Sequence, residues 1–244
     1  MKAIFKREFA SYFKSPLGYI FLGLFWAFSA YVFMGTNVAY ATTIMASYFS
    51  TIVFVFIVAI PLLTMKMFSE ERKQKTDQLL LTSPVSVTEI VLGKFLSGLL
   101  VLGIGVLGTI LYLIFMKIYG NPAIAESLVG YLGILLYGAM LISIGMYVSS
   151  RTQNQVIAAV VTLAIVGVLS VSGNFAFDFS SLFNGAFSFI GTFLNGAISF
   201  ININARFADF AAGTLNIVPL FYFLSITALF ILLTIRAIEK RRWR

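Results

Sequence analysis

The chain contains neither cysteine nor histidine among its 244 residues. Without cysteine there is no disulfide and no thiolate nucleophile. Without histidine the chain lacks the commonest metal ligand and the usual proton carrier near neutral pH. No catalytic carboxylate pair and no phosphate-binding GxxxxGK[ST] motif replaces them. We therefore predict no catalytic residue, no metal site, no cofactor of its own and no enzymatic activity.

Charge is also scarce, since only 11% of the residues are charged while 60% are hydrophobic. A soluble domain of this length would carry about 25% charged residues. The apolar runs are continuous rather than alternating, which favours membrane-spanning helices over barrel strands. The sequence therefore predicts an all-α integral membrane protein. Its net charge of +8 is attributed to topology, and we expect the lipid bilayer and no nucleic acid as a partner.

Six apolar runs are long enough to cross a bilayer, which needs roughly 20 residues. The first run begins with Ser15 as a helix N-cap and Pro16 as the first helical residue. We treat the whole chain, 1–244, as a single transmembrane domain because no connection could bury a core of its own. The predicted spans cover about 17–35, 49–67, 95–118, 129–148, 156–173 and 218–235.

The distribution of basic residues predicts the orientation. With six spans, all of the 17 Lys and Arg residues except Lys117 and Arg206 fall on one side. Cytoplasmic loops carry an excess of Lys and Arg. Both termini are therefore predicted to be cytoplasmic, in a multi-pass protein of the cytoplasmic membrane.

The first 14 residues predict a helix lying in the inner membrane interface. Its aromatic residues fall on one helical face and its lysines nearer the other. A cleaved signal peptide is the alternative, but the apolar run that follows is too long and lacks a convincing cleavage site. The aromatic residues are Phe5, Phe9, Tyr12 and Phe13, and the lysines are Lys2, Lys6 and Lys14.

Segment 179–205 is uncharged but only half apolar. A seventh span here would place the basic C-terminus outside, against the charge rule. We expect short amphipathic or re-entrant helices in the outer leaflet; an outer loop packed on the bundle is the alternative. Phenylalanines four residues apart form an apolar face and a candidate outer gate. The candidate gate residues are Phe179, Phe183, Phe187, Phe189 and Phe193.

The charged segment 65–94 separates two uncharged stretches, 15–65 and 95–116. Residues 69–81 have helical character, with Glu71 and Lys75 placed to pair at i,i+4. Pro84 ends this helix. The pattern from Ser86 to Glu89 is a capping box that starts a second helix. The segment is therefore predicted as helix, break, helix along the cytoplasmic surface. Its charged residues are Lys66, Glu70, Glu71, Arg72, Lys73, Lys75, Asp77, Glu89 and Lys94.

Two features of this segment favour contact with a protein partner or with the membrane over a simply solvated loop. It carries four acidic residues, which topology does not require, and it presents Leu79, Leu80 and Leu81 to the cytoplasm. A solvated loop carrying inside-positive charge is the alternative. The candidate hinges are Pro61, Pro84 and Gly93.

The segment FSEERKQKTDQLLLTSPVSVTEIVLGKF resembles the loop after the second span of ABC-2 type permeases, most closely the gliding-motility type. REFASYFKSPLGYIF, SSRTQNQVIAA and FADFAAG match in the same order. The resemblance implies a dimer with a second, identical or related, permease copy and two ABC ATP-binding subunits that hold ATP and Mg. It also implies an auxiliary membrane-anchored protein in some relatives. The implied coupling helix would dock on the ATPase through Glu70, Glu71, Arg72, Lys73, Thr76, Leu79, Leu80 and Leu81.

The sequence predicts a permease subunit of an ATP-driven exporter. A non-transporting membrane scaffold that anchors a larger assembly remains the alternative. A secondary transporter is disfavoured because no ionisable residue lies well inside a span. The uncharged, aromatic spans suit an amphipathic or lipid-linked substrate.

Overall fold

The computed structural model describes residues 2–76, 85–171 and 202–242. These ranges contain α-helices and one short π-helical stretch, and no strand, which confirms the all-α class. Some predicted site residues lie outside the described residues. They are Leu79, Leu80, Leu81 and Pro84 in the charged segment, and Phe179, Phe183, Phe187, Phe189 and Phe193 in the outer segment.

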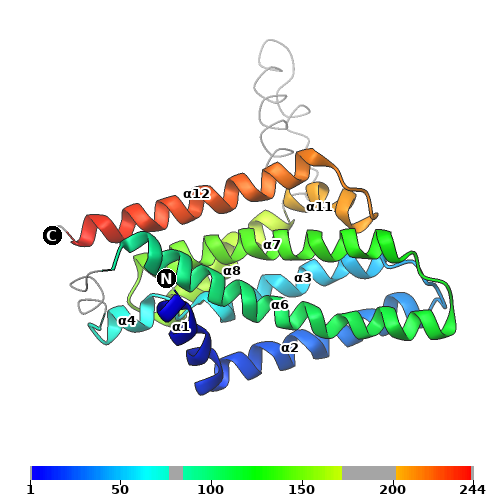
Figure 1. The fold of residues 1–244 in the computed structure, drawn as a ribbon, viewed down its shortest axis with the longest axis horizontal. Helices are drawn as coiled ribbons and strands as arrows, with labels where there is room; N and C mark the ends of the chain where they lie inside the picture. Colours follow the sequence, from blue (N-terminus) through cyan, green and yellow to red (C-terminus); the bar gives the residue numbers. More distant parts are fainter. Residues whose placement is uncertain (1, 77–84, 172–201, 243–244) are drawn as a thin grey trace, which may run out of the picture.

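Six roughly parallel helices make up an elongated bundle (Figure 1). They are α2 (Pro16–Phe33), α3 (Ala46–Thr64), α6 (Val87–Tyr119), α7 (Ile124–Arg151), α8 (Gln155–Val171) and α12 (Ile217–Arg242). Each overlaps one of the six predicted apolar runs, with α6 beginning before the predicted span 95–118 and α12 ending after the predicted span 218–235. By length and composition, five of them can cross a membrane, while α8 is a shorter apolar helix. The chain is therefore a multi-pass membrane protein.

The start of α2 confirms the predicted N-cap position, with Ser15 extended and Pro16 as the first helical residue. The Ser15 hydroxyl does not cap the helix and instead accepts a hydrogen bond from Lys66. At its other end, α2 continues into the π-helix η1 (Met34–Val38). There the buried Asn37 amide donates to two carbonyls of the following loop and holds the turn toward α3.

Helix α7 forms the centre of the bundle. In its most apolar window 72% of the residues are buried, compared with 22% for α12 at the periphery. The ring of Tyr137 lies in the middle of α7, against Phe56 of α3 and Phe223 of α12. The hydrophobic effect contributes little to helix association in lipid, so close side-chain packing of this kind stabilises the contacts between the helices.

The short helix α11 (Ile203–Ala211) packs into this bundle before α12 begins. Its N-cap is Asn202, whose side chain accepts from Ala205 N, and Phe207 and Phe210 are fully buried. Asn204 donates to the Ser170 carbonyl at the end of α8. A short helix with one buried face therefore begins within the last residues of the predicted outer segment.

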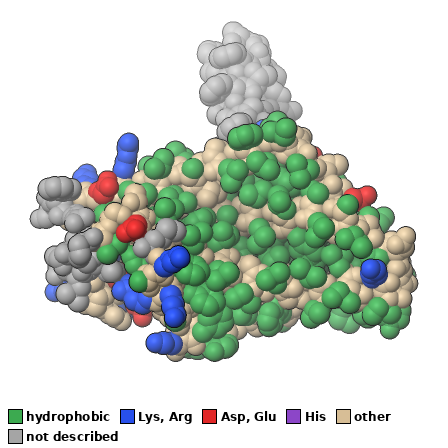
Figure 2. Space-filling view, viewed as in Figure 1, with side chains coloured by type: hydrophobic (Ala, Val, Ile, Leu, Met, Phe, Trp, Pro, Cys, Tyr) green, Lys and Arg blue, Asp and Glu red, His purple; other side chains and the backbone are tan. Residues whose placement is uncertain are grey.

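Charged side chains gather at one end of the face in Figure 2, and a broad apolar band covers its middle. The N-terminal helix α1 (Lys2–Lys14), the short helix α4 (Ser69–Lys73) and the C-terminal end of α12 all lie at this end (Figure 1). The fold thus brings the charged segment together with both ends of the described chain. We call this the charged end of the bundle.

Candidate functional site

The charged segment leaves the bundle through a break at the end of α3. Helix α3 runs through Pro61 and ends at Thr64, and α4 resumes at Ser69. Glu70 and Glu71 occupy the first turn of α4, where the helix dipole favours negative charge. The hinge role of Pro61 stays a prediction.

Helix α4 is shorter than the helix predicted over residues 69–81. It ends at Lys73, and Lys75 has a φ of 56°, which a helix cannot include. The expected i,i+4 pair between Glu71 and Lys75 is therefore wrong. Glu71 instead pairs with Arg7 and Lys94, because the buried Lys94 needs an anionic partner more than the exposed Lys75 does.

Ser149, near the end of α7, holds the break between α3 and α4. Its hydroxyl accepts hydrogen bonds from the backbone N–H groups of Phe68 (3.1 Å) and Ser69 (3.2 Å). It donates to the Met65 carbonyl at 3.1 Å. Arg72 of α4 adds a hydrogen bond of 2.8 Å to the neighbouring Ser150 carbonyl. Through these contacts α4 is fixed to the most buried helix of the bundle.

We expect Ser149→Ala to lower the free energy of unfolding by about 1 to 2 kcal/mol, since buried backbone N–H groups of Phe68 and Ser69 lose their acceptor. Unfolding in an SDS titration measures this. Ser225→Ala serves as the control, because that exposed α12 hydroxyl bonds only within its own helix. Equal stability of the two variants would show that Ser149 does not hold the break.

The residues predicted to form the coupling surface separate into two groups. Lys73 and Thr76 are exposed, together with Gln74 and Lys75. Glu70 is half-buried, and Glu71 and Arg72 turn inward toward the bundle. The accessible part of this surface therefore begins at the last residue of α4.

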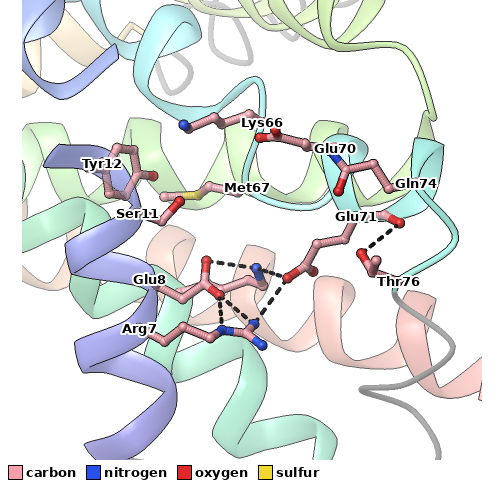
Figure 3. A pocket seen from close by; sticks show the side chains of 11 residues that line it. Arg7, Glu8, Ser11, Tyr12, Lys66, Met67, Glu70, Glu71, Gln74 and Thr76 are labelled. Carbon is pink, nitrogen blue, oxygen red and sulfur yellow. Dashed lines mark hydrogen bonds and ion pairs between the residues drawn. The ribbon is translucent and has the colours of Figure 1, made fainter. Parts of the chain in front are cut away.

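Glu71 belongs to a cluster of four charged residues from three helices (Figure 3), whereas Arg72 bonds to the Ser150 carbonyl. Lys94 Nζ of α6 lies 2.9 Å from Glu8 Oε2 of α1 and 2.9 Å from Glu71 Oε1 of α4. Arg7 Nη2 lies 2.6 Å from Glu8 Oε1 and 3.2 Å from Glu71 Oε1. We refer to Arg7, Glu8, Glu71 and Lys94 as the ion cluster. Its two positive and two negative charges balance.

The ion cluster affects its two carboxyls differently: burial raises the pKa of Glu71 despite the nearby Lys94, whereas the pKa of Glu8 is lowered. Burial opposes the charged form of this carboxyl, but the nearby Lys94 and Arg7 outweigh burial and lower its pKa. Glu8 is therefore ionised throughout the neutral pH range. Sequence reasoning missed Arg7, Glu8 and Lys94 as a site. The available signal was the position of Glu8 one turn from both Ile4 and Tyr12, on what becomes the buried face of α1.

Helix α1 turns its predicted aromatic face inward, and its three lysines are exposed as predicted. Tyr12 is buried together with Ile4, and Glu8 lies between them, while Phe5, Phe9 and Phe13 are half-buried beside them. This inward face packs against the start of α6. The location of α1 in the membrane interface stays a prediction.

Gly93 provides the space for this contact. A Cβ atom at Gly93 would lie 3.0 Å from Ile4 Cγ2. Helix α6 is continuous through Gly93, and its first residue Val87 follows the N-cap Ser86, whose hydroxyl accepts from Glu89 N at 3.3 Å. The predicted cap is confirmed. The second helix of the charged segment is therefore the start of α6 itself, and the hinge role of Gly93 stays a prediction.

A polar cavity of about 280 Å³ lies between α1 and α4, beside the ion cluster (Figure 3). Lys66 reaches into this region, where it donates to Ser15 and lies 5.8 Å from the centre of the Tyr12 ring. The acidic and basic residues lining the cavity are Arg7, Glu8, Lys66, Glu70, Glu71 and Lys94. Because both signs are equally represented, the cavity does not favour an anion or a cation.

Comparison with known protein families identifies the family of this chain. A family model described as ABC-2 family transporter protein matches residues 9–243. No match was found among curated proteins. The match includes the charged segment and all six long helices. It confirms, at the level of the family, the resemblance seen in the sequence. The narrower likeness to gliding-motility permeases stays a prediction. The chain belongs to the ABC-2 transporter family and is a membrane permease domain of that family.

Proposed function

We propose that the chain is the permease subunit of an ATP-driven ABC-2 exporter in the cytoplasmic membrane. A separate ABC subunit would bind ATP and Mg, because this chain contains no GxxxxGK[ST] motif. The ATPase would dock at the charged end of the bundle. A second permease copy, identical or related, would complete the transporter. The auxiliary membrane-anchored protein belongs to some relatives only.

The attachment of α4 is the observation that carries this proposal. Ser149 and Ser150 tie α4 to α7, and Lys94 ties it to α6. The residues that follow, Lys73 to Thr76, remain exposed. A short surface helix bound to several membrane helices can transmit a displacement to all of them. A loop held only by its ends would absorb the same displacement.

We further propose that α8 is the sixth span. Its 17 residues rise about 25 Å, slightly less than the hydrocarbon core of roughly 30 Å, and it packs against both α3 and α7. Six crossings place both termini on the same side, which agrees with α1 and the end of α12 lying at the charged end (Figure 1). The excess of Lys and Arg at this end supports a cytoplasmic location.

We infer an amphipathic or lipid-linked substrate. The apolar stretches of the spans contain no ionisable residue at mid-depth that could bind a small ion or carry protons. Their exposed side chains are large and apolar, including Phe28, Tyr31 and Phe54. Lipid-like chains suit such a surface.

Co-purification tests the docking surface. The permease is expressed with the ABC ATPase encoded beside its gene, and ATPase bound to the tagged permease is quantified. We expect Lys73→Glu/Lys75→Glu to reduce binding about ten-fold or more, because both exposed charges are reversed. Lys117→Glu is the control, since this exposed lysine lies in the last turn of α6, away from the charged end.

Two outcomes contradict the proposal in different ways. If the double variant bound the ATPase as well as the unmodified permease, α4 and the residues after it would not be the docking surface. Binding with an ATPase rate that is the same with and without permease would favour the scaffold function instead.

A further inference from the structure

Lys94 is buried, whereas a lysine that served only as a surface charge would be exposed to solvent. It is 1% exposed and is the only buried charged side chain among the described residues. It lies in the second turn of α6, beyond the Ser86 cap and next to the uncharged stretch that starts at Phe95. A buried ammonium is costly unless it is paired and hydrogen-bonded. A contact that is retained at this cost suggests a specific role.

The contacts of Lys94 come from different elements of the chain. Glu8 belongs to α1, Glu71 belongs to α4, and the Phe68 ring, 5.1 Å from Nζ, belongs to the break before α4. Among the described residues, the one other basic partner of these two acids is Arg7, which is about half exposed. Lys94 is therefore the one buried group among the described residues that binds α1 and α4 at the same time.

We propose that Lys94 is a positioning residue that clamps α1 and α4 onto α6, so that the three helices move as one body when the ATPase acts on the charged end. The proposal rests on the proposed function and adds α1 to the coupling machinery. It also changes the role of Glu71, from a residue of the docking surface to an internal connection between that surface and the third membrane helix.

The packing around the cluster supports a rigid unit. Next to Lys94, Gly93 lets α1 approach α6 until Ile4 contacts the helix backbone. On the same face of α1, two turns after Ile4, the Tyr12 hydroxyl donates to the Leu63 carbonyl in the last turn of α3. A displacement of α4 that preserved the Lys94 contacts would therefore reach α1, α3 and α6 together.

A charge-balanced variant separates positioning from folding. Glu71→Gln/Lys94→Met removes one charge of each sign and leaves the Arg7–Glu8 pair in place. The chain is free of cysteine, so spin labels at Ala3→Cys on α1 and Gln74→Cys after α4 report the distance between these elements. Both positions are exposed. Distances are measured in the permease alone, while ATPase binding and permease-stimulated ATP hydrolysis are measured in the unlabelled complex.

The proposal predicts a narrow distance distribution in the otherwise unmodified chain and a broadened one in the double variant. ATPase binding should change little, since the exposed residues are intact, whereas stimulation should fall about ten-fold. Lys117→Met, which removes the other lysine of α6, should leave all three quantities unchanged. A change in stimulation without a change in binding is not expected from a merely structural contact.

An equally narrow distribution in the double variant would overturn the clamp. Broadening with undiminished stimulation would also overturn it, because the cluster would then be only structural. Failure of the unmodified permease to bind the ATPase would refute the proposed function instead. The distance measurement would still decide whether the contacts of Lys94 and Glu71 join α1 to α4.

Discussion

The single substitution Lys94→Met should lower the free energy of unfolding by about 3 kcal/mol, the lower end of the range for breaking a buried ion pair. Removal of the ammonium leaves Glu8 and Glu71, both mostly buried, with their carboxylates facing one another. Arg7 remains within 3.2 Å of both acids and offsets part of the loss. The expected loss of stability is therefore large but below the upper end of the range for breaking a buried ion pair.

Unfolding in SDS, followed by helix content, measures this loss. Lys117→Met is the control, because the same substitution on the same helix removes an exposed lysine. Adding Glu71→Gln to Lys94→Met should restore most of the stability, since the cluster is neutral again. Equal stability of Lys94→Met and Lys117→Met would mean that the ion cluster contributes nothing to the fold.

Gly145→Val should also destabilise the protein by about 3 kcal/mol, the upper end for adding volume to a packed core. A Cβ atom at Gly145 would collide with the Thr64 hydroxyl and lie 2.8 Å from Thr64 Cβ. Thr64 cannot easily move away, because it is fully buried and bonded to the Ile60 carbonyl. The end of α3, and with it α4, would be pushed away from α7.

Gly103→Val provides a matched control for this prediction. Gly103 lies in the middle of α6, and a Cβ atom there would have no neighbour within 4 Å. Both variants carry the same helix propensity cost, so a difference in SDS unfolding reports the α3–α7 contact alone. If the two variants were equally stable, close packing at Gly145 would not position the end of α3.

Local features of the charged end followed directly from the sequence. The Ser86 cap depends on neighbouring residues only, and the structure has the cap where the pattern predicts it. The α2 start at Ser15 and Pro16 has the same local origin. The family could also be predicted, because the segment from Phe68 to Phe95 is distinctive.

Contacts between distant residues could not be predicted in the same way. The spacing of Glu71 and Lys75 suggested a pair on one helix, but α4 stops at Lys73 and Glu71 reaches Lys94 instead. Glu8 and Lys94 are 86 residues apart, and no helical period connects them. Their meeting depends on how α1 crosses the start of α6, which Gly93 and Ile4 decide by their size.

The sequence by itself determined that this is a helical membrane protein, where its apolar runs lie, and which segment stays outside lipid. These properties depend on composition and on periods of a few residues, so each can be predicted without knowing the neighbours. The tertiary structure alone decided which charges of that segment are exposed and which turn inward. Glu71 turns inward because the buried Lys94 ammonium requires anionic partners. Only the packing of α1, α4 and α6 places Glu8 and Glu71 within hydrogen-bond distance of that ammonium.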